Sequence, residues 1–260
     1  MAIHRVEGIM GMPIEVDLRD ETPSDIEPVF DWFREVDSVF STYKAESQIS
    51  RFNSGSLAEG DLDTPVRDVL RRCEELREVT DGYFDVRSLP LPLSLIDSSG
   101  QTITHGIDPS GYVKGWAVDR AADQLRGLGA RNFLINAGGD LRVAGGALPQ
   151  ASWRVGIQHP LELDKTAAVV EANDLAVATS GEYIRGRHIL NPHTARAPEG
   201  VLSVTVVGPD LGEADAYATA AFAMGDEGPR WTMSLDGYQA MTILAHELVL
   251  YTPGFPRAEE

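Results

Sequence analysis

Two oxygen-bearing side chains lie one helical turn apart in the segment EADAYATAAFAMG, residues 213–225. Asp215 and Thr219 are four residues apart, so they share one side of the predicted helix. A carboxylate and a hydroxyl in this arrangement could bind the same hard cation, and Mg²⁺ with a phosphate ester as a further ligand is the natural chemistry. The alternative is that Asp215 favours the helix N-terminus through the helix dipole and Thr219 bonds the carbonyl four residues earlier.

A lysine between two glycines is the second group of interest, in the segment GIDPSGYVKGWAVDRAA. Gly111 and Gly115 flank Lys114 immediately before the helix predicted over residues 116–130, so backbone and ammonium could approach an anion at a positive helix end. A solvated lysine in an ordinary loop-to-helix connection explains the same residues equally well. Asp108 could pair with Lys114, accept a hydrogen bond from a ligand or cap a turn.

Histidines supply the candidate proton carriers. The segment VATSGEYIRGRHILNPHTA contains Thr179, Ser180, His188 and His193, and imidazole is the group that exchanges protons near neutral pH. The alternative is a structural role, which is the commoner one for a single histidine. The sequence has no zinc-ligand spacing, because Cys73 is its single cysteine and the histidines are scattered.

A glycine-rich stretch, NAGGDLRVAGG, raises the question of a Rossmann-type dinucleotide site. The spacing does not match G-x-G-x-x-G, and a strand-like segment rather than a helix follows Gly138 and Gly139. A tight hairpin that needs positive φ at these glycines is therefore favoured over a contact with a ligand.

Charge and hydropathy exclude several classes of partner. The 40 acidic and 22 basic residues give a formal charge of −18, which repels phosphate backbones and anionic lipids. The sequence shows no secretory signal and no run of about 18 apolar residues, so we expect a cytoplasmic protein with neither nucleic acid nor membrane as a partner. Cys73 lies on the apolar face of a predicted helix and is expected to be a small core residue.

Hydrophobic periodicity and turn residues predict interleaved helices and strands. Helices are expected over residues 24–40, 64–80, 116–130, 213–225 and 228–235. Strands are expected over residues 7–19, 132–137, 140–146, 153–157, 167–171, 175–179, 201–207, 239–245 and 247–252. Residues 41–55 are predicted to form a loop, and residues 86–107 carry too many turn signals for an assignment. Since no regular βαβ order is present, we expect an α+β fold of mainly antiparallel strands and helices in one domain, residues 1–260.

Taken in order, these segments resemble the FAD:protein FMN transferase (ApbE-like) family. The similar pieces are MGMPIEV, STYKAESQISRFN, TDGYFDV, IDPSGYVKGWAVDRAADQL, LINAGGDLRVAGG, VATSGEYIRGRHILNP and EADAYATAAFAMG. They run from about residue 9 to residue 225, and several motifs in one order are far more specific than a single short pattern. The resemblance implies one ApbE-like domain.

The resemblance also implies roles for individual residues. FAD is expected to contact Met10, Tyr43, Tyr83, Phe84, Asp85, Asp108, Lys114, His188 and Ile189. Mg²⁺ is expected to bind the Gly111 carbonyl, Asp215 and Thr219. Lys114 would stabilise negative charge on the transferring phosphoryl group, and His188 would act as a proton carrier.

The implied reaction is Mg²⁺-dependent transfer of FMN from FAD to a threonine hydroxyl of an acceptor protein, with release of AMP. Two alternatives use the same pocket: a Mg²⁺-dependent FAD pyrophosphatase that gives FMN and AMP, and a flavin-binding protein without turnover. The chain departs from the family pattern at three places. Met12 replaces a threonine, Ala195 replaces a glycine, and RSLPLPLSL follows the GYFDV turn.

Overall fold

The computed structural model describes residues 3–87, 90–96, 102–181 and 189–258. The strands in these ranges are β1 (Ile3–Ile9), β2 (Met12–Leu18), β3 (Pro90–Ile96), β4 (Thr102–His105), β5 (Phe133–Ala137), β6 (Asp140–Ala144), β7 (Trp153–Gln158), β8 (Thr166–Ala172), β9 (Leu175–Gly181), β10 (Val201–Gly208), β11 (Gln239–Leu244) and β12 (Val249–Tyr251). The α-helices are α1 (Glu27–Phe40), α2 (Gln48–Asn53), α3 (Thr64–Val79), α4 (Ser110–Gly127), α5 (Leu211–Ala223) and α6 (Gly228–Thr232), and the short 3-10 helices are η1 (Glu59–Asp61) and η2 (Gly225–Glu227).

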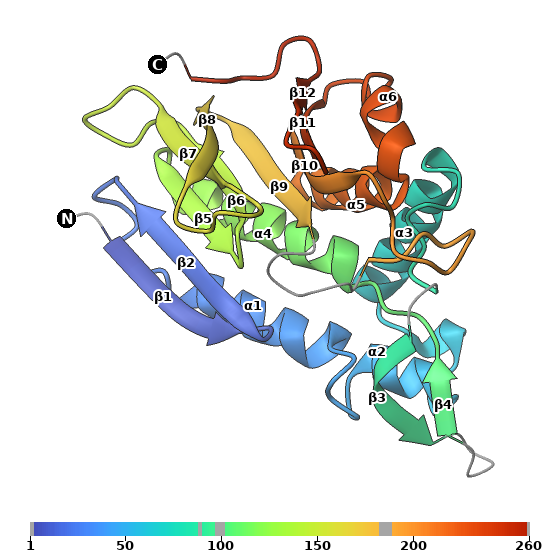
Figure 1. The fold of residues 1–260 in the computed structure, drawn as a ribbon. Helices are drawn as coiled ribbons and strands as arrows, with labels where there is room; N and C mark the ends of the chain where they lie inside the picture. Colours follow the sequence, from blue (N-terminus) through green and yellow to red (C-terminus); the bar gives the residue numbers. More distant parts are fainter. Residues whose placement is uncertain (1–2, 88–89, 97–101, 182–188, 259–260) are drawn as a thin grey trace.

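One large sheet organises the chain. It has eight strands in the order β1-β2-β5-β6-β9-β10-β11-β12, and each neighbouring pair is antiparallel. The hairpins β3–β4 and β7–β8 form two separate two-stranded sheets (Figure 1). Helices interleaved with antiparallel strands confirm the predicted α+β class.

Helices and strands cover opposite faces of the large sheet. Figure 1 shows α1, α4 and α5 on one face and the β7–β8 hairpin on the other. Alternation along β10 explains both contacts, because Val204 and Val206 belong to the core under the helices while Val207 belongs to the core under the hairpin. The sheet is therefore shared by two buried cores.

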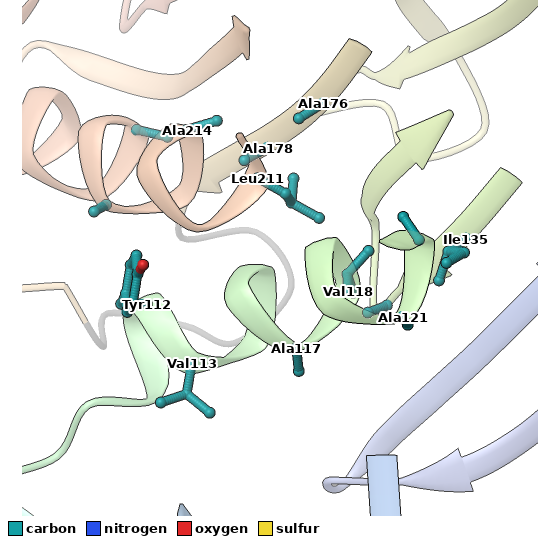
Figure 2. Packing of buried hydrophobic residues seen from close by; sticks show 14 of the residues in the cluster. Tyr112, Val113, Ala117, Val118, Ala121, Ile135, Ala176, Ala178, Leu211 and Ala214 are labelled. Carbon is teal, nitrogen blue, oxygen red and sulfur yellow. The ribbon is translucent and has the colours of Figure 1, made fainter. Parts of the chain in front are cut away.

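Helix α5 is buried on almost every side, which explains its high alanine content. Its residues pack between the sheet and α4, and Figure 2 shows Leu211 and Ala214 beside Ala176 and Ala178 of β9. Small side chains permit this close packing. The same tight environment surrounds the polar residues that α5 carries.

The crossing of α4 and α5 is tighter still, because glycines face each other there. A Cβ atom on Gly115 would lie 2.6 Å from backbone atoms of Leu211 and Gly212, and one on Gly212 would lie 2.7 Å from the Tyr112 ring. The two backbones therefore touch with no side chain between them. This contact fixes how the residues next to Gly115 and Gly212 face each other.

The single strand predicted over residues 7–19 is wrong, because β1 and β2 form a hairpin there. Met10 and Gly11 join the strands with φ of 56° and 73°, the left-handed conformation that a type I′ turn requires. The sequence did not predict this turn because it has a methionine there, and residues other than glycine, asparagine and aspartate seldom have positive φ. The pair Gly138–Gly139 does form the predicted hairpin, with φ of 62° and 103°.

The helix predicted over residues 116–130 begins earlier, at Ser110, so the expected loop around Lys114 is wrong and that lysine is helical. Two residues start the helix. Pro109 has a φ close to the helical value, and the Asp108 carboxylate accepts the N–H of Ser110 at 3.0 Å. Of the three roles considered for Asp108, the structure therefore shows the capping of a turn.

Other segments differ from the predictions in detail. The segment 41–55 is not a continuous loop, because it contains α2, whose first turn is capped by the Ser47 hydroxyl. Strands β3 and β4 occupy part of the unassigned region 86–107. Cys73 is buried in the core as predicted, and burial raises the pKa of its thiol to about 12. Within the described residues, no helix combines the length and the apolar character that crossing a membrane would need.

Gly115→Ala is expected to destabilise the fold by about 1–3 kcal/mol, because the new methyl group meets backbone atoms that cannot move aside. Gly127→Ala is the matched control in the same helix, since a Cβ there meets nothing within 4 Å. The control should be neutral or stabilising by up to about 1 kcal/mol. Urea unfolding followed by circular dichroism measures both variants, and equal unfolding free energies would contradict the proposed backbone contact.

Candidate active site

The helix crossing brings Lys114 of α4 against Asp215 of α5. Lys114 directly precedes Gly115, and Asp215 follows Gly212 by one helical turn, so both lie next to the closest contact of the helices. The Lys114 Nζ is 3.2 Å from Asp215 Oδ2, and the side chains are 15% and 6% exposed. Opposite charges in such a buried place interact strongly. Lys114 is therefore an ion-pair partner and not the solvated lysine of the alternative interpretation.

A second carboxylate, which the sequence pattern did not indicate, completes the ion pair. Asp140 begins β6 and is buried. One of its oxygens contacts the Lys114 ammonium, and the other accepts the Thr179 N–H at 3.0 Å. In the sequence, only its position directly after the Gly138–Gly139 turn could have marked Asp140 as a site residue. Its contact with Lys114 of α4 forms only when the chain has folded.

Thr219 lies one turn after Asp215, as the helical spacing predicted. Its Oγ1 is 3.2 Å from the Oγ of Ser180, which β9 presents beneath α5. Either hydroxyl can donate in this pair, so Thr219 can keep an oxygen lone pair available to a ligand. The structure thus brings Lys114, Asp215 and Thr219 together and adds Asp140 and Ser180 to them.

The donor set suits a hard divalent cation such as Mg²⁺. It offers two carboxylates and two hydroxyls, the kind of oxygen ligands that Mg²⁺ prefers. The Lys114 ammonium offsets one of the two carboxylate charges, so these groups retain a negative charge that a bound cation would offset. Among the described residues, no three His, Cys, Asp or Glu side chains form a ready-made metal site, so a cation here would also draw on hydroxyl, carbonyl or phosphate oxygens.

Gly111, whose carbonyl is the expected third protein ligand, lies in the first turn of α4. A Cβ atom on Gly111 would lie 3.3 Å from the Phe84 ring, so these two residues are in contact. Phe84 is buried, and its N–H donates to the Thr80 hydroxyl at 3.1 Å. The turn after α3 and the start of α4 are therefore packed together.

The same turn carries Tyr83 and Asp85. It begins at Asp81, which has a left-handed φ of 52°. His193 closes over it: Nε2 is 2.9 Å from the Asp81 carbonyl oxygen, and the imidazole centroid is 4.6 Å from that of the Tyr83 ring. A carbonyl oxygen can only accept, so the donor is His193 Nε2–H. His193 therefore has the structural role that was considered above as the alternative to proton transfer. In the same turn, the Asp85 carboxylate accepts the Arg87 N–H at 2.9 Å.

The remaining residues expected at FAD come from separate segments. Met10 forms the β1–β2 turn, and the Tyr43 residue is 75% exposed, which leaves its ring available for stacking. Asp108 caps the first turn of α4, and Ile189 is buried in the main core. Within the described residues, no hydrogen bond or ion pair connects these four. His188 lies outside the described residues.

Two departures from the family pattern have visible structural consequences. Met12 packs against the second hairpin turn, where a Cβ on Gly138 would lie 3.1 Å from the methionine sulfur. Ala195 has a φ of 55°, a conformation that costs an alanine about 1–2 kcal/mol. Both turns are formed despite the changed residues.

Two carboxylates cap the N-terminus of α5. Asp210 accepts the Glu213 N–H at 2.8 Å, and Asp119 of α4 accepts the first two N–H groups of the helix at 2.7 and 3.1 Å. Burial raises the pKa of Asp119 to about 7, and the adjacent Asp210 carboxylate adds to that effect. Both aspartates line a cavity of about 340 Å³ between α3 and α4.

The fold and the site together define an α+β protein in which two crossing helices and a strand bury a lysine–carboxylate group. The sequence model of the ApbE family matches residues 10–96 and 94–242, and the chain belongs to this family. The predicted resemblance is thereby confirmed.

Curated relatives and solved structures agree with this assignment. The FAD:protein FMN transferase of Vibrio cholerae is 29% identical over 74% of this chain and 71% of its own length, and that of Haemophilus influenzae is 26% identical over 80% and 74%. The structure of the flavin transferase ApbE from Vibrio cholerae gives a TM-score of 0.83 at 24% identity, covering 98% of both chains. The ApbE protein of Thermotoga maritima gives 0.84 at 23% identity, covering 99% of this chain and 100% of that one. The two structures show a shared fold.

The contribution of Asp119 to stability is expected to fall as pH rises from about 4 to about 7, because the Asp119 pKa in the folded state lies above its ordinary value of 3.8. In that window the folded chain keeps a proton that the unfolded chain has lost, and the advantage is gone once pH passes through about 7. Asp119→Asn keeps an oxygen acceptor for α5 but does not titrate. Its unfolding free energy should therefore depend less steeply on pH, by on the order of 1 kcal/mol per unit.

Urea unfolding of wild type and variant at several pH values tests this expectation. Asp123→Asn is the matched control, because Asp123 lies on the same helix with its side chain 60% exposed. The control should keep the wild-type pH profile. Identical slopes for Asp119→Asn and wild type would show that Asp119 does not titrate in this range.

Proposed function

We propose that this protein transfers FMN from FAD to a threonine hydroxyl of an acceptor protein, releases AMP and requires Mg²⁺. Membership in the ApbE family supports the reaction, because relatives named FAD:protein FMN transferase match most of the chain. The observation that carries the proposal is the buried group of Lys114, Asp215 and Thr219. Positive charge for a phosphate and oxygen ligands for Mg²⁺ converge there.

The proposed reaction exchanges one phosphorus–oxygen bond for another. The threonine oxygen attacks the FMN phosphorus of FAD, the bond from this phosphorus to the bridging oxygen breaks, and AMP leaves with that oxygen. The hydroxyl proton passes to a base, for which we propose His188. The product is a phosphoester between the acceptor threonine and FMN.

Each residue of the buried group has a proposed part in this reaction. Asp215, Thr219 and the Gly111 carbonyl would hold Mg²⁺, which neutralises charge on the pyrophosphate when bound. Lys114 contributes an ammonium at the same place and stabilises the negative charge that develops during transfer. Since the packing of α4 on α5 buries these groups, their electrostatic effects are stronger than in water.

Residues on the surrounding turns are proposed to bind FAD. They are Met10, Tyr43, Tyr83, Phe84, Asp85, Asp108, Lys114, His188 and Ile189. The exposed Tyr43 ring could stack on a ring of the ligand. The contact of Phe84 with Gly111 supports the proposal that the turn after α3 and the start of α4 contribute to one FAD site, because it holds the two segments side by side.

Two further proposals concern the chain as a whole. We propose one domain over residues 1–260, and the large sheet supports it, because its edge strands β1 and β12 come from opposite ends of the described chain. The cytoplasmic location and the exclusion of nucleic acid and membrane as partners stay predictions based on charge and composition.

A Mg²⁺-dependent FAD pyrophosphatase is the second candidate, since water in place of threonine would use the same residues. Such an enzyme releases AMP and free FMN without an acceptor. A flavin-binding protein without turnover would release neither. The presence of Asp215 and Thr219 beside Lys114 argues against that third possibility, because flavin binding alone does not need a site for a metal.

Asp215→Asn is expected to lower Mg²⁺-dependent AMP release from FAD by at least about 100-fold, because a neutral amide replaces a charged metal ligand. AMP is quantified by chromatography over a Mg²⁺ titration, after urea unfolding has shown that the variant is folded. Asp123→Asn makes the same substitution at an exposed site and should release AMP at the wild-type rate. Wild-type release by Asp215→Asn would contradict the proposed metal site.

A further inference from the structure

A single exposed histidine joins two segments that lie far apart in the sequence. His193, in the loop before β10, contacts the turn that follows α3, and its hydrogen-bond partner Asp81 is 112 residues away. The His193 Nε2–H donates to the Asp81 carbonyl oxygen at 2.9 Å, and the imidazole meets the Tyr83 ring edge-on at an interplanar angle of 69°. A Cβ atom on Gly82 would lie 3.4 Å from the imidazole Cε1. His193 therefore contacts three successive residues of this turn.

The loop that carries His193 is shaped by its own hydrogen bonds. The Asn191 side chain accepts the His193 N–H at 2.9 Å, and the Asn191 carbonyl accepts the Ala195 N–H at 2.8 Å. The Asn191 N–H donates in turn to the Arg196 carbonyl at 2.8 Å. Ile189, just before this loop, is buried in the main core. His193 thus extends from a hydrogen-bonded base that is anchored in the core.

The turn under His193 has a backbone conformation that needs support. Asp81 and Gly82 are both left-handed, with φ of 52° and 76°, and a residue other than glycine seldom keeps this conformation unless its surroundings impose it. The Tyr83 N–H donates to the Thr80 carbonyl at 3.1 Å, which ties the turn to the end of α3. The hydrogen bond from His193 reaches the Asp81 carbonyl from a separate segment and so holds the turn from its other side.

The same turn carries three of the residues that are proposed to bind FAD, namely Tyr83, Phe84 and Asp85. Phe84 is buried and packs against Gly111, so the core fixes its place. Tyr83 is only half-buried, and the edge of the His193 ring contacts its ring. A ligand binds more tightly when the group that contacts it is already held in the bound position. Support from His193 would therefore matter most for Tyr83.

We infer that His193 is a positioning residue for FAD binding: through its hydrogen bond to Asp81, it holds the turn that presents Tyr83 to the ligand. The inference rests on the proposed function for the contact between Tyr83 and FAD. His193 acts through the turn and not on the reacting phosphorus. It therefore affects how tightly FAD binds, and not how fast bound FAD reacts.

His193→Ala is expected to raise the Kd for FAD about fivefold, the effect of losing one hydrogen bond. In His193→Gln the side-chain amide can still donate to the Asp81 carbonyl, so its Kd should stay within about twofold of wild type. His246→Ala changes another exposed histidine, between β11 and β12, and should bind FAD as wild type does. Titration of FAD fluorescence, in EDTA and in Mg²⁺, measures each Kd. Equal Kd values for His193→Ala and wild type, or equal weakening by Ala and Gln, would overturn the inference.

Kinetics and a double variant test whether His193 acts through binding and through Tyr83. In AMP release, His193→Ala should raise the KM for FAD and keep kcat within about twofold of wild type. His193→Ala combined with Tyr83→Ala should bind FAD no more weakly than Tyr83→Ala by itself. A lower kcat with an unchanged KM, or a further loss of affinity in the double variant, would overturn the inference. If wild type bound FAD but released no AMP, the proposed function would fail, and the Kd values would still decide the role of His193.

Discussion

The backbone contact between α4 and α5 is the constraint on which the candidate site depends. Gly115 and Gly212 leave no side chain between the helices, and this closeness places Lys114 at 3.2 Å from Asp215. Glycine within a helix costs about 0.5–1 kcal/mol relative to alanine, so two glycines at one crossing reduce helix stability. Close packing of α4 against the alanine-rich α5 offsets that loss.

Charge compensation is the second requirement, because the groups at the site are buried. The Lys114 ammonium has Asp140 and Asp215 as partners, and Asp140 is in turn held by a backbone N–H of β9. At the start of α5, Asp119 and Asp210 bind N–H groups that would otherwise lack partners within the helix. The helix that presents the proposed metal ligands is thus anchored at its end as well as along its side.

Local patterns in the sequence predicted what depends on local geometry. Asp215 and Thr219 share a helix face because helical spacing is the same wherever the helix lies. Residue spacing in the sequence could not predict three other features of the structure. Met10 has the positive φ usually taken by glycine, α4 begins at Ser110 under the influence of a preceding aspartate, and Asp140 reaches α4 only once the sheet has formed. The family resemblance supplied what spacing could not, namely which separate segments form one site.

The buried Lys114 group is proposed to support the transfer of FMN from FAD to a protein threonine. The most direct measurement incubates the purified protein with FAD, Mg²⁺ and a threonine-bearing acceptor peptide, and records the intact mass of the peptide together with the amount of AMP. We expect the peptide to gain one FMN for each AMP released, and to stay unmodified when Mg²⁺ is removed. Release of AMP with an unmodified peptide at every Mg²⁺ concentration would contradict the transferase and favour hydrolysis of FAD.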